Sequence, residues 1–469
     1  MGVNLPCCIE SIASYRPKAL YALRMLLAPL AIDPIWVDRA ELGETGLYYG
    51  PDTSSMSSSV LCLDLSPETQ AYFAEGIPYP SGRARWCEWD GTSWPVLFAS
   101  DANGEPDLVA SAFYWLSAWQ EYTCTERDQH GRFPYAASLQ AALGTATLPV
   151  VDAYRELLAG RFIQHGIRVE RRKWGGASWA MCPTYDVDYL RKWRKGMIYR
   201  EAVHYLLYNH RSLSVGGRLR RFGRFLADWL RPTDVYRSAF ERLYLETKRR
   251  HGAATFFLKA GVHGPNDVFY SLDDALLKRM LPRLVKDGFE IGLHPSYHAH
   301  THPEYLTEEQ ARLAAIASLV SVRQHYLRYE APATPRIQER AGFRIDSTLG
   351  FSERAGFRLA TCFPVQRFDA QANTCTDVWE MPLAAMESAL FNRRGLTPEE
   401  AIGESEELLQ TCKRFGGVAV MMWHNVLWDE LDHPGWGHHF TETLDSAAAQ
   451  GAMVTSLRHA LASWLGEEV

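Results

Sequence analysis

Apolar runs that alternate with helical patterns in the second half of the sequence most constrain the fold. Short runs such as 254–258 and 289–294 are bounded by Gly or Pro, or lie close to one, as expected of buried strands. Residues 273–286 and 307–326 repeat apolar positions at helical spacing, and the second stretch opens with a capping-box sequence, Thr307-Glu-Glu-Gln310. Strands that alternate with helices predict a parallel sheet. We therefore expect an α/β fold whose sheet closes into a barrel.

Two histidines follow one of these predicted strands. In Gly288-Phe-Glu-Ile-Gly-Leu-His294-Pro-Ser-Tyr-His298 the apolar run ends at His294, and His298 lies four positions further on. Loops at the carboxyl ends of parallel strands carry the chemistry of α/β enzymes. Neutral imidazoles suit zinc, cobalt or nickel, and two of them leave a carboxylate to complete an open metal site. The sequence should therefore hold an acidic partner at another strand end.

Asp186 and Asp188 meet this expectation at the end of the apolar run that begins at residue 177. They alternate around Val187, so their side chains point to the same side of an extended chain. One of the two carboxylates can bind a metal while the other takes a proton.

Length and charge bound the organisation of the chain. Its 469 residues suffice for two domains or for one large domain with additions. We expect a smaller mixed α/β accessory domain over residues 1–170 and the barrel over 175–469, with a basic helical insertion at about 191–235. The 49 basic and 55 acidic residues give a net charge of −6, which offers no general case for nucleic-acid binding.

The N-terminal sequence and the cysteines favour a cytoplasmic location. Residues 1–8 lack the basic start and apolar core of a signal peptide. Nine cysteines without CxxC spacing are typical of reduced thiols rather than of a disulfide framework or a zinc knuckle.

Positive charge is concentrated in one segment, from Arg191 to Arg231. This segment holds eleven Lys and Arg residues against only Glu201 and Asp228. Apolar residues such as Phe225 interleave with them at helical spacing, which predicts a basic amphipathic helix. Such a helix fits peripheral contact with the inner face of a membrane or with the phosphates of a lipid- or nucleotide-linked sugar. It equally fits a solvated helix packed on the domain.

Five motifs in sequence order resemble the polysaccharide deacetylases of the NodB-homology class, carbohydrate esterase family 4. Their order and spacing agree with that family across residues 177–430, and five in sequence are a strong signal. The motifs are Thr184-Tyr-Asp186-Val-Asp188, Ala254-Thr-Phe-Phe-Leu258, His294-Pro-Ser-Tyr-His298, Arg328-Tyr-Glu-Ala-Pro332 and Trp423-His424-Asn425. The accessory half before the barrel resembles members associated with bacterial surface-polysaccharide synthesis.

The resemblance implies a distorted (β/α) barrel and metal-dependent removal of an N- or O-acetyl group from a sugar of a polysaccharide or its precursor. By the resemblance, Asp186 is the general base and Arg328 orients it, while His424 is the general acid. Asp346 is our candidate for the carboxylate that tunes His424. The implied cofactor is a divalent metal, zinc before cobalt, nickel or manganese, and the implied ligands are Asp188, His294 and His298.

The first motif departs from the family pattern. The family usually has adjacent aspartates there, but Val187 takes the second place, so the metal role passes to Asp188. Two other functions stay open: hydrolysis of another linear or cyclic amide on the same barrel, and glycan binding without catalysis.

Overall fold

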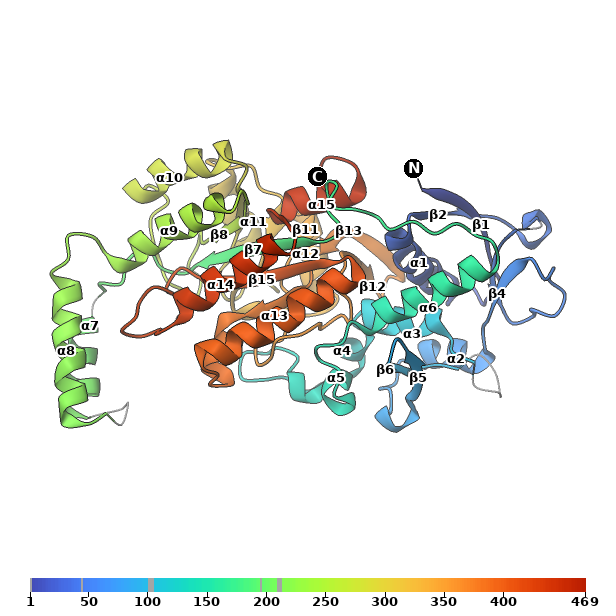
Figure 1. Ribbon diagram of the computed structural model, residues 1–469, viewed down its shortest axis with the longest axis horizontal. Coiled ribbons are helices and arrows are strands. Elements are labelled where there is room, and N and C mark those ends of the chain that lie inside the picture. The colour runs from blue at the N-terminus through green and yellow to red at the C-terminus, as the bar shows by residue number, and fades with distance from the viewer. Residues whose placement is uncertain (1, 44, 100–104, 195, 209–212) are drawn as a thin grey trace.

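The computed structural model describes residues 2–43, 45–99, 105–194, 196–208 and 213–469. These residues form a four-stranded sheet toward one end of the molecule and a ten-stranded sheet nearer its middle, with helices packed around both (Figure 1). The expected α/β class, with a smaller α/β unit before a second, larger sheet, is confirmed.

The N-terminal sheet is parallel and has the strand order β2-β1-β3-β4. Its strands are β1 (Val3–Ile9), β2 (Ile32–Trp36), β3 (Gly46–Gly50) and β4 (Val60–Asp64). A hairpin of β5 (Arg85–Trp89) and β6 (Thr92–Val96) follows. The accompanying helices are α1 (Arg16–Leu27), α2 (Pro67–Glu75), α3 (Leu108–Leu116), α4 (Trp119–Thr123), α5 (Leu139–Leu143) and α6 (Val150–Gln164).

The second sheet has ten strands, nine of them in the order β12-β13-β11-β10-β9-β8-β7-β15-β14, with β16 beside β7. All neighbours are parallel except β12 and β13. Among the described strands, β12 and β14 are the two edges and do not pair with each other, so the curled sheet stays open as a half-barrel. The strands are β7 (Ala180–Val187), β8 (Thr255–Leu258), β9 (Glu290–Leu293), β10 (Ser321–Val322), β11 (Ile345–Asp346), β12 (Val365–Asp369), β13 (Thr374–Glu380), β14 (Leu383–Met386), β15 (Val418–His424) and β16 (Met453–Val454).

Strand register brings the carboxyl ends of the central strands to one edge. Asp186 on β7 lies opposite His424 on β15, and Val187 lies opposite Leu258 on β8. Leu258 in turn pairs with Leu293 on β9, which pairs with Val322 on β10. The residues that follow these strands therefore converge at this edge, as the sequence predicts.

Helices cover the outside of the second sheet, and one of them corrects a sequence prediction. They are α9 (Val235–Arg249), α10 (Ala275–Lys286), α11 (Pro303–Ala314), α12 (Ala333–Arg340), α13 (Pro398–Phe415), α14 (Trp436–Ala449) and α15 (Leu457–Leu465). The long helix predicted over 307–326 was wrong: α11 starts earlier, at Pro303, and ends at Ala314. Pro is favoured in the first helical turn, and the Leu-Val-Ser-Val sequence that follows enters the short strand β10.

The basic segment forms a projection that we call the basic arm, described over residues 197–208 and 213–231. It contains α7 (Met197–Tyr199), the π-helix η5 (Arg200–Leu207) and α8 (Val215–Trp229), and it extends from the end of the molecule far from the N-terminal sheet (Figure 1). Lys195 and Arg211, which belong to the predicted basic segment, lie outside the described residues. None of the helices in the described part of the chain has the length and apolar character needed to cross a bilayer.

Buried polar contacts join the N-terminal unit to the second sheet. Arg358 forms two hydrogen bonds with the Glu121 carboxylate, at 2.8 and 2.7 Å, and both side chains are buried. Asp152 on α6 accepts a hydrogen bond from the amide of Cys362 at 2.9 Å. Helix α1 packs against β12 and β13. One continuous hydrophobic core therefore runs through both units.

Candidate active site

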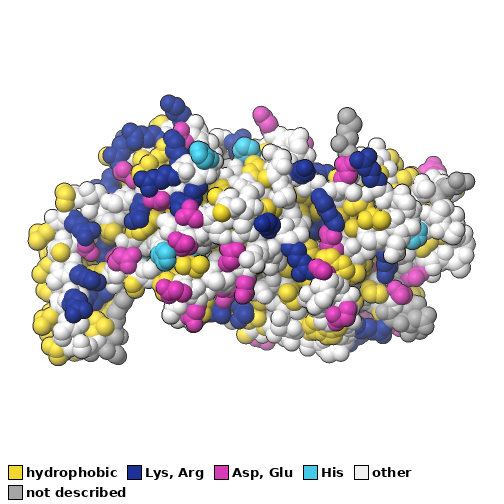
Figure 2. Space-filling view, viewed as in Figure 1, with side chains coloured by type: hydrophobic (Ala, Val, Ile, Leu, Met, Phe, Trp, Pro, Cys, Tyr) yellow, Lys and Arg dark blue, Asp and Glu magenta, His cyan; other side chains and the backbone are white. Residues whose placement is uncertain are grey.

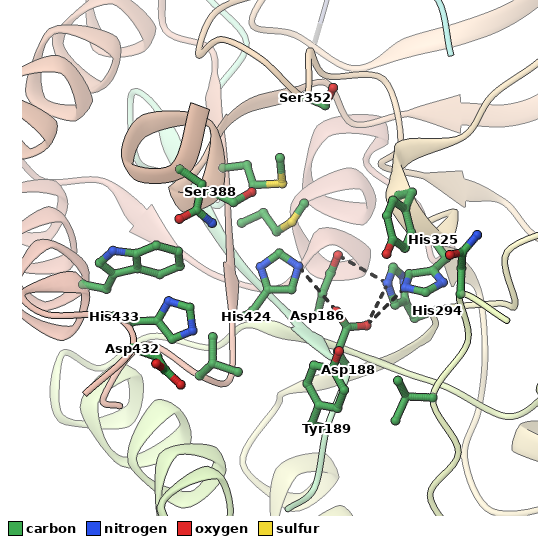
Figure 3. A pocket seen from close by; sticks show the side chains of 18 of the residues that line it. Asp186, Asp188, Tyr189, His294, His325, Ser352, Ser388, His424, Asp432 and His433 are labelled. Carbon is green, nitrogen blue, oxygen red and sulfur yellow. Dashed lines mark ion pairs between the residues drawn. The ribbon is translucent and has the colours of Figure 1, made fainter. Parts of the chain in front are cut away.

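Five polar side chains from the ends of four strands meet at the carboxyl edge of the second sheet: Asp186 and Asp188 from β7, His294 from β9, His325 from β10 and His424 from β15. Around Asp186, His424 lies on one side and His294 and His325 lie on the other (Figure 3). Asp188 lies between the two sides, since it is within 4.0 Å of His294, His325 and His424. The site therefore has the two-sided layout that acid–base chemistry on a bound group requires.

Asp188, His294 and His325 form a group that could hold a metal ion. The Asp188 Oδ1 atom lies 3.6 Å from Nε2 of His294 and 3.6 Å from Nε2 of His325. Ligands about 2.1 Å from a tetrahedral zinc are about 3.4 Å from each other, so the spacing fits a shared ion.

The environment of these three side chains also fits a cation. Asp188 Oδ1 is buried and has no hydrogen-bond partner in the described part of the chain. His294 Nδ1 lies 2.7 Å from the carbonyl oxygen of Arg323, which accepts its proton and leaves Nε2 free to face Asp188. His325 Nδ1 lies 3.1 Å from Asp267, which can orient the ring in the same way.

His298, the expected third ligand, does not join this group. It lies in the turn after β9, where its ring is close to the rings of Tyr297 and His302. Its carbonyl oxygen lies 3.0 Å from Nδ1 of His302. The chain turns away after His294, and His325 from the neighbouring strand β10 occupies the third position instead.

Arg323, rather than Arg328, contacts Asp186. Its Nη1 donates to Asp186 at 3.1 Å and to Thr184 at 2.6 Å, while its Nε donates to the carbonyl of Ser347 at 2.7 Å. Arg328 donates to the carbonyls of His130 and Tyr297, both at 2.7 Å, so it joins two loops. The register explains this difference, because Arg323 follows β10 directly and Arg328 lies one loop beyond it.

Glu387, rather than Asp346, contacts His424. Oε1 of Glu387 lies 2.6 Å from Nδ1 of His424 and accepts a hydrogen bond from its backbone amide at 2.8 Å. Asp346 is fully buried on β11, where it accepts a hydrogen bond from Thr348. β11 is separated from β15 by four strands, whereas Glu387 follows β14, the neighbour of β15.

The electrostatic surroundings differentiate the two sides of the site. Burial raises the pKa of Asp186 above its usual range, although the charge of Arg323 opposes this. Burial alone would lower the pKa of His424, but the charges of Glu387, Asp188 and Asp186 raise it to about 10. Burial and the charge of Lys259 lower the pKa of His294, which keeps its imidazole neutral. At neutral pH, His424 can therefore donate a proton and His294 can bind a metal.

Lys259 is a further charged group that the sequence analysis did not select. It follows β8, and its Nζ lies 3.0 Å from Nδ1 of His325 and 3.9 Å from the carboxylates of Asp188 and Asp267. Burial lowers the pKa of this amine, and the two carboxylates oppose that change. Lys259 therefore places an amine beside the carboxylates of Asp188 and Asp267.

The site opens into a cavity of about 560 Å³. His433 and Trp436 line it. Other aromatic and cationic side chains contribute to its wall: Tyr189, Tyr205, Tyr236, Tyr326, Arg132, Arg194, Arg200 and Arg393. A volume of this size accommodates a sugar-sized ligand.

Sequence reasoning missed Arg323, His325 and Glu387, although a local signal existed for each. Arg323 and His325 follow the apolar stretch that ends at Val322, and Glu387 follows the run Leu383–Met386. A polar residue at the carboxyl end of a predicted parallel strand is the feature that also identified Asp186 and His294.

Comparison with known proteins gives one short family match and distant structural likenesses. Residues 64–165 match a family of unknown function (DUF7033), and no curated protein matches the chain. The chain is similar to a protein from Mycobacterium smegmatis assigned to the polysaccharide deacetylases, at 18% identity and a TM-score of 0.40, covering 63% of this chain and 94% of that one. It is also similar to the allantoinase Puue, at 12% identity and a TM-score of 0.40, covering 62% and 92%. The chitin deacetylase of Colletotrichum lindemuthianum matches at 11% identity and a TM-score of 0.32, covering 63% and 90%. A likeness this low does not establish the function of the chain.

Proposed function

We propose that the chain is a metal-dependent deacetylase that hydrolyses an N-acetyl or O-acetyl group on a sugar of a polysaccharide or its precursor. The observation that carries the proposal is the opposed arrangement of Asp186, held by Arg323, and His424, held by Glu387, across the group Asp188, His294 and His325. The motif resemblance in the sequence supports the same reaction.

The metal ligands in this proposal are Asp188, His294 and His325. A bound divalent cation, zinc before cobalt, nickel or manganese, would polarise the acetyl carbonyl and lower the pKa of water. The three side chains supply one carboxylate and two imidazoles, a donor set with an open position for water and substrate.

Asp186 acts as the general base. It accepts a proton from the water whose oxygen attacks the acetyl carbonyl carbon. Arg323 fixes the carboxylate through Oδ1, which leaves Oδ2 facing the site, 3.8 Å from Nε2 of His294. Arg323 is therefore a positioning residue.

His424 acts as the general acid. Its Nε2 atom faces Asp188 at 3.8 Å, and its Nδ1 is bound by Glu387, so the proton it donates is on Nε2. That proton goes to the sugar nitrogen as the carbon–nitrogen bond breaks, giving acetate and a free amine. An unprotonated amine anion is a poor leaving group, so this step is needed for an amide substrate.

The sugar substrate is supported by the wall of the cavity. Tyrosine and tryptophan side chains offer flat faces for stacking on sugar rings, and the arginines suit a substrate that also carries negative charge. A cytoplasmic location belongs to the same proposal and fits the nine free cysteines.

The test measures acetate released by the zinc-reconstituted protein from N-acetylated and O-acetylated oligosaccharides. We expect release from at least one of them, and a loss of about 10³-fold or more in kcat for Asp186→Asn with zinc retained. Zinc bound without release of acetate from any acetylated sugar would overturn the proposal. Ring opening of a cyclic ureide such as allantoin in its place would indicate the other amide hydrolase.

A further inference from the structure

The basic arm carries an amphipathic helix whose apolar side faces outward. In α8, Val215 is 64% exposed, Leu219 60%, Leu226 37% and, just beyond the last turn, Leu230 83%. Their spacing of four, seven and four residues places them on one side of the helix. Trp229 beside them is 45% exposed. An isolated exposed leucine is ordinary, but a continuous stripe of this length indicates a surface that binds something apolar.

The opposite side of α8 is anchored to the body of the protein. Arg221 is buried and pairs with Glu201 at 2.9 Å and with Asp432 at 2.7 Å. Phe225 is buried, and its ring lies 5.6 Å from the ring of Trp193. These contacts fix the orientation of the helix, and in this orientation its apolar stripe is exposed.

Positive charge accompanies the stripe. The described residues of the basic arm include six arginines and two carboxylates, Glu201 and Asp228. Arg220 and Arg224 are exposed and pair with no carboxylate in the described part of the chain. Hydrophobic and basic side chains stand together on this projection in Figure 2. This composition complements an anionic, partly apolar surface.

We propose that the basic arm binds the surface of an anionic lipid membrane through the apolar stripe of α8 and its flanking arginines. Tyr199 and Tyr208, both exposed on the same arm, add aromatic side chains of the kind found at the membrane–water interface. A second copy of the chain fits the apolar stripe less well than a membrane does, because pairing two such arms would bring arginines of one against arginines of the other.

The arm also forms part of the wall of the cavity, which connects membrane binding to the substrate. Arg200 and Tyr205 on η5 line the cavity together with Asp432, the residue that anchors Arg221. A substrate whose lipid is in the membrane would then reach the site along the arm. This part rests on the proposed deacetylase function and specifies its substrate as a lipid-linked acetylated sugar.

The experiment measures co-sedimentation of the full-length protein with phosphatidylcholine vesicles that contain or lack phosphatidylglycerol, at low salt. We expect binding to the anionic vesicles only, and a loss of about tenfold or more in Leu219→Glu/Leu226→Glu. The charge variant Arg220→Gln/Arg224→Gln should lose roughly 30-fold, since each basic residue near such a surface contributes about 1 kcal/mol. The matched control is Ile163→Glu, which changes a residue that is 64% exposed on α6 and should bind as the wild type does.

Three results would overturn the membrane proposal: no binding by the wild type, equal binding by the wild type and both arm variants, or a dimer that Leu219→Glu/Leu226→Glu dissociates. Acetate release from a soluble acetylated oligosaccharide separates this proposal from the enzymatic one. Release without vesicle binding refutes the membrane proposal alone. Vesicle binding that is unchanged in Asp186→Asn, together with no acetate release by the wild type, refutes the deacetylase proposal. The same result supports membrane binding by the basic arm.

Discussion

His325 and His298 lead to opposite predictions for metal binding. His325 lies 3.6 Å from the Asp188 carboxylate, whereas His298 lies in the next turn against Tyr297 and His302. We expect His325→Ala to weaken zinc binding by about 100-fold or more, because it removes one of three ligands. His298→Ala should bind zinc as the wild type does. The measurement is metal content after reconstitution and dialysis, and loss of zinc in His298→Ala alone would contradict the assignment.

Glu387 is predicted to position the general acid. Glu387→Gln removes the charge that holds His424 protonated, so kcat for an N-acetyl substrate should fall by about 10²-fold. Hydrolysis of 4-nitrophenyl acetate should fall much less, because nitrophenolate leaves without a proton. The readout is therefore the ratio of the two rates, at unchanged zinc content.

Asp346→Asn is the control for this ratio, since Asp346 does not contact His424. A changed ratio in Asp346→Asn and an unchanged one in Glu387→Gln would restore the assignment made from sequence.

The sequence predicted those site residues that directly end long apolar runs. Asp186, Asp188, His294 and His424 follow such runs, and the structure brings them together. It could not select Arg323 over Arg328, because only the register of a two-residue strand decides which arginine reaches Asp186. The sequence also could not select Glu387 over Asp346 as the carboxylate beside His424, because that choice depends on whether β14 or β11 neighbours β15.

At the scale of single elements, the cap of α3 makes stability depend on pH. Asp107 accepts a hydrogen bond from the amide of Ala110 at 2.9 Å and another from Tyr49, and it is buried. Burial raises the pKa of this carboxyl to about 7, against about 3.9 in an unfolded chain. A raised native pKa stabilises the fold fully below about pH 4, and this contribution is lost as the pH rises through about 7.

Asp107→Asn should remove this dependence while it keeps the cap, since Asn also accepts at the N-cap position. We expect the difference in unfolding free energy between wild type and variant to change by at most about 4 kcal/mol between pH 4 and pH 8. Denaturant unfolding across this range measures it. Parallel pH profiles for the two proteins would show that Asp107 does not titrate there.

Element prediction succeeded where one pattern dominated and failed where two overlapped. Residues 254–258, 273–286 and 289–294 are single, uninterrupted patterns, and β8, α10 and β9 lie within these predicted bounds. Residues 307–326 instead contain the end of a helix and a short strand, and the apolar spacing of both reads as one helix. Merging them placed His325 inside the predicted helix, so it was not selected as a candidate ligand.

At the scale of the whole molecule, the buried pair Glu121 and Arg358 should make the two units unfold together. Glu121→Gln leaves the Arg358 charge buried without its partner and should cost about 3–5 kcal/mol. Asp90→Asn is the control, because Asp90 pairs with Arg414 across the same two units but at the surface, where we expect at most about 1 kcal/mol. Calorimetry should show one transition, and two separate transitions would contradict the coupling. The unit boundary between residues 170 and 175 stays a prediction.

The placement of α1 against β12 has a consequence for aggregation. In the described sheet β12 pairs only with β13. The backbone groups on its other edge are therefore available for pairing with a strand of another molecule. The N-terminal unit covers this region through α1, and Tyr122 donates to the carbonyl of Phe368 on β12 at 3.3 Å. The N-terminal unit thus shields this edge of the second sheet from pairing with strands of other molecules. Removing this unit would leave the edge of β12 open to pairing between molecules, and therefore to polymerisation.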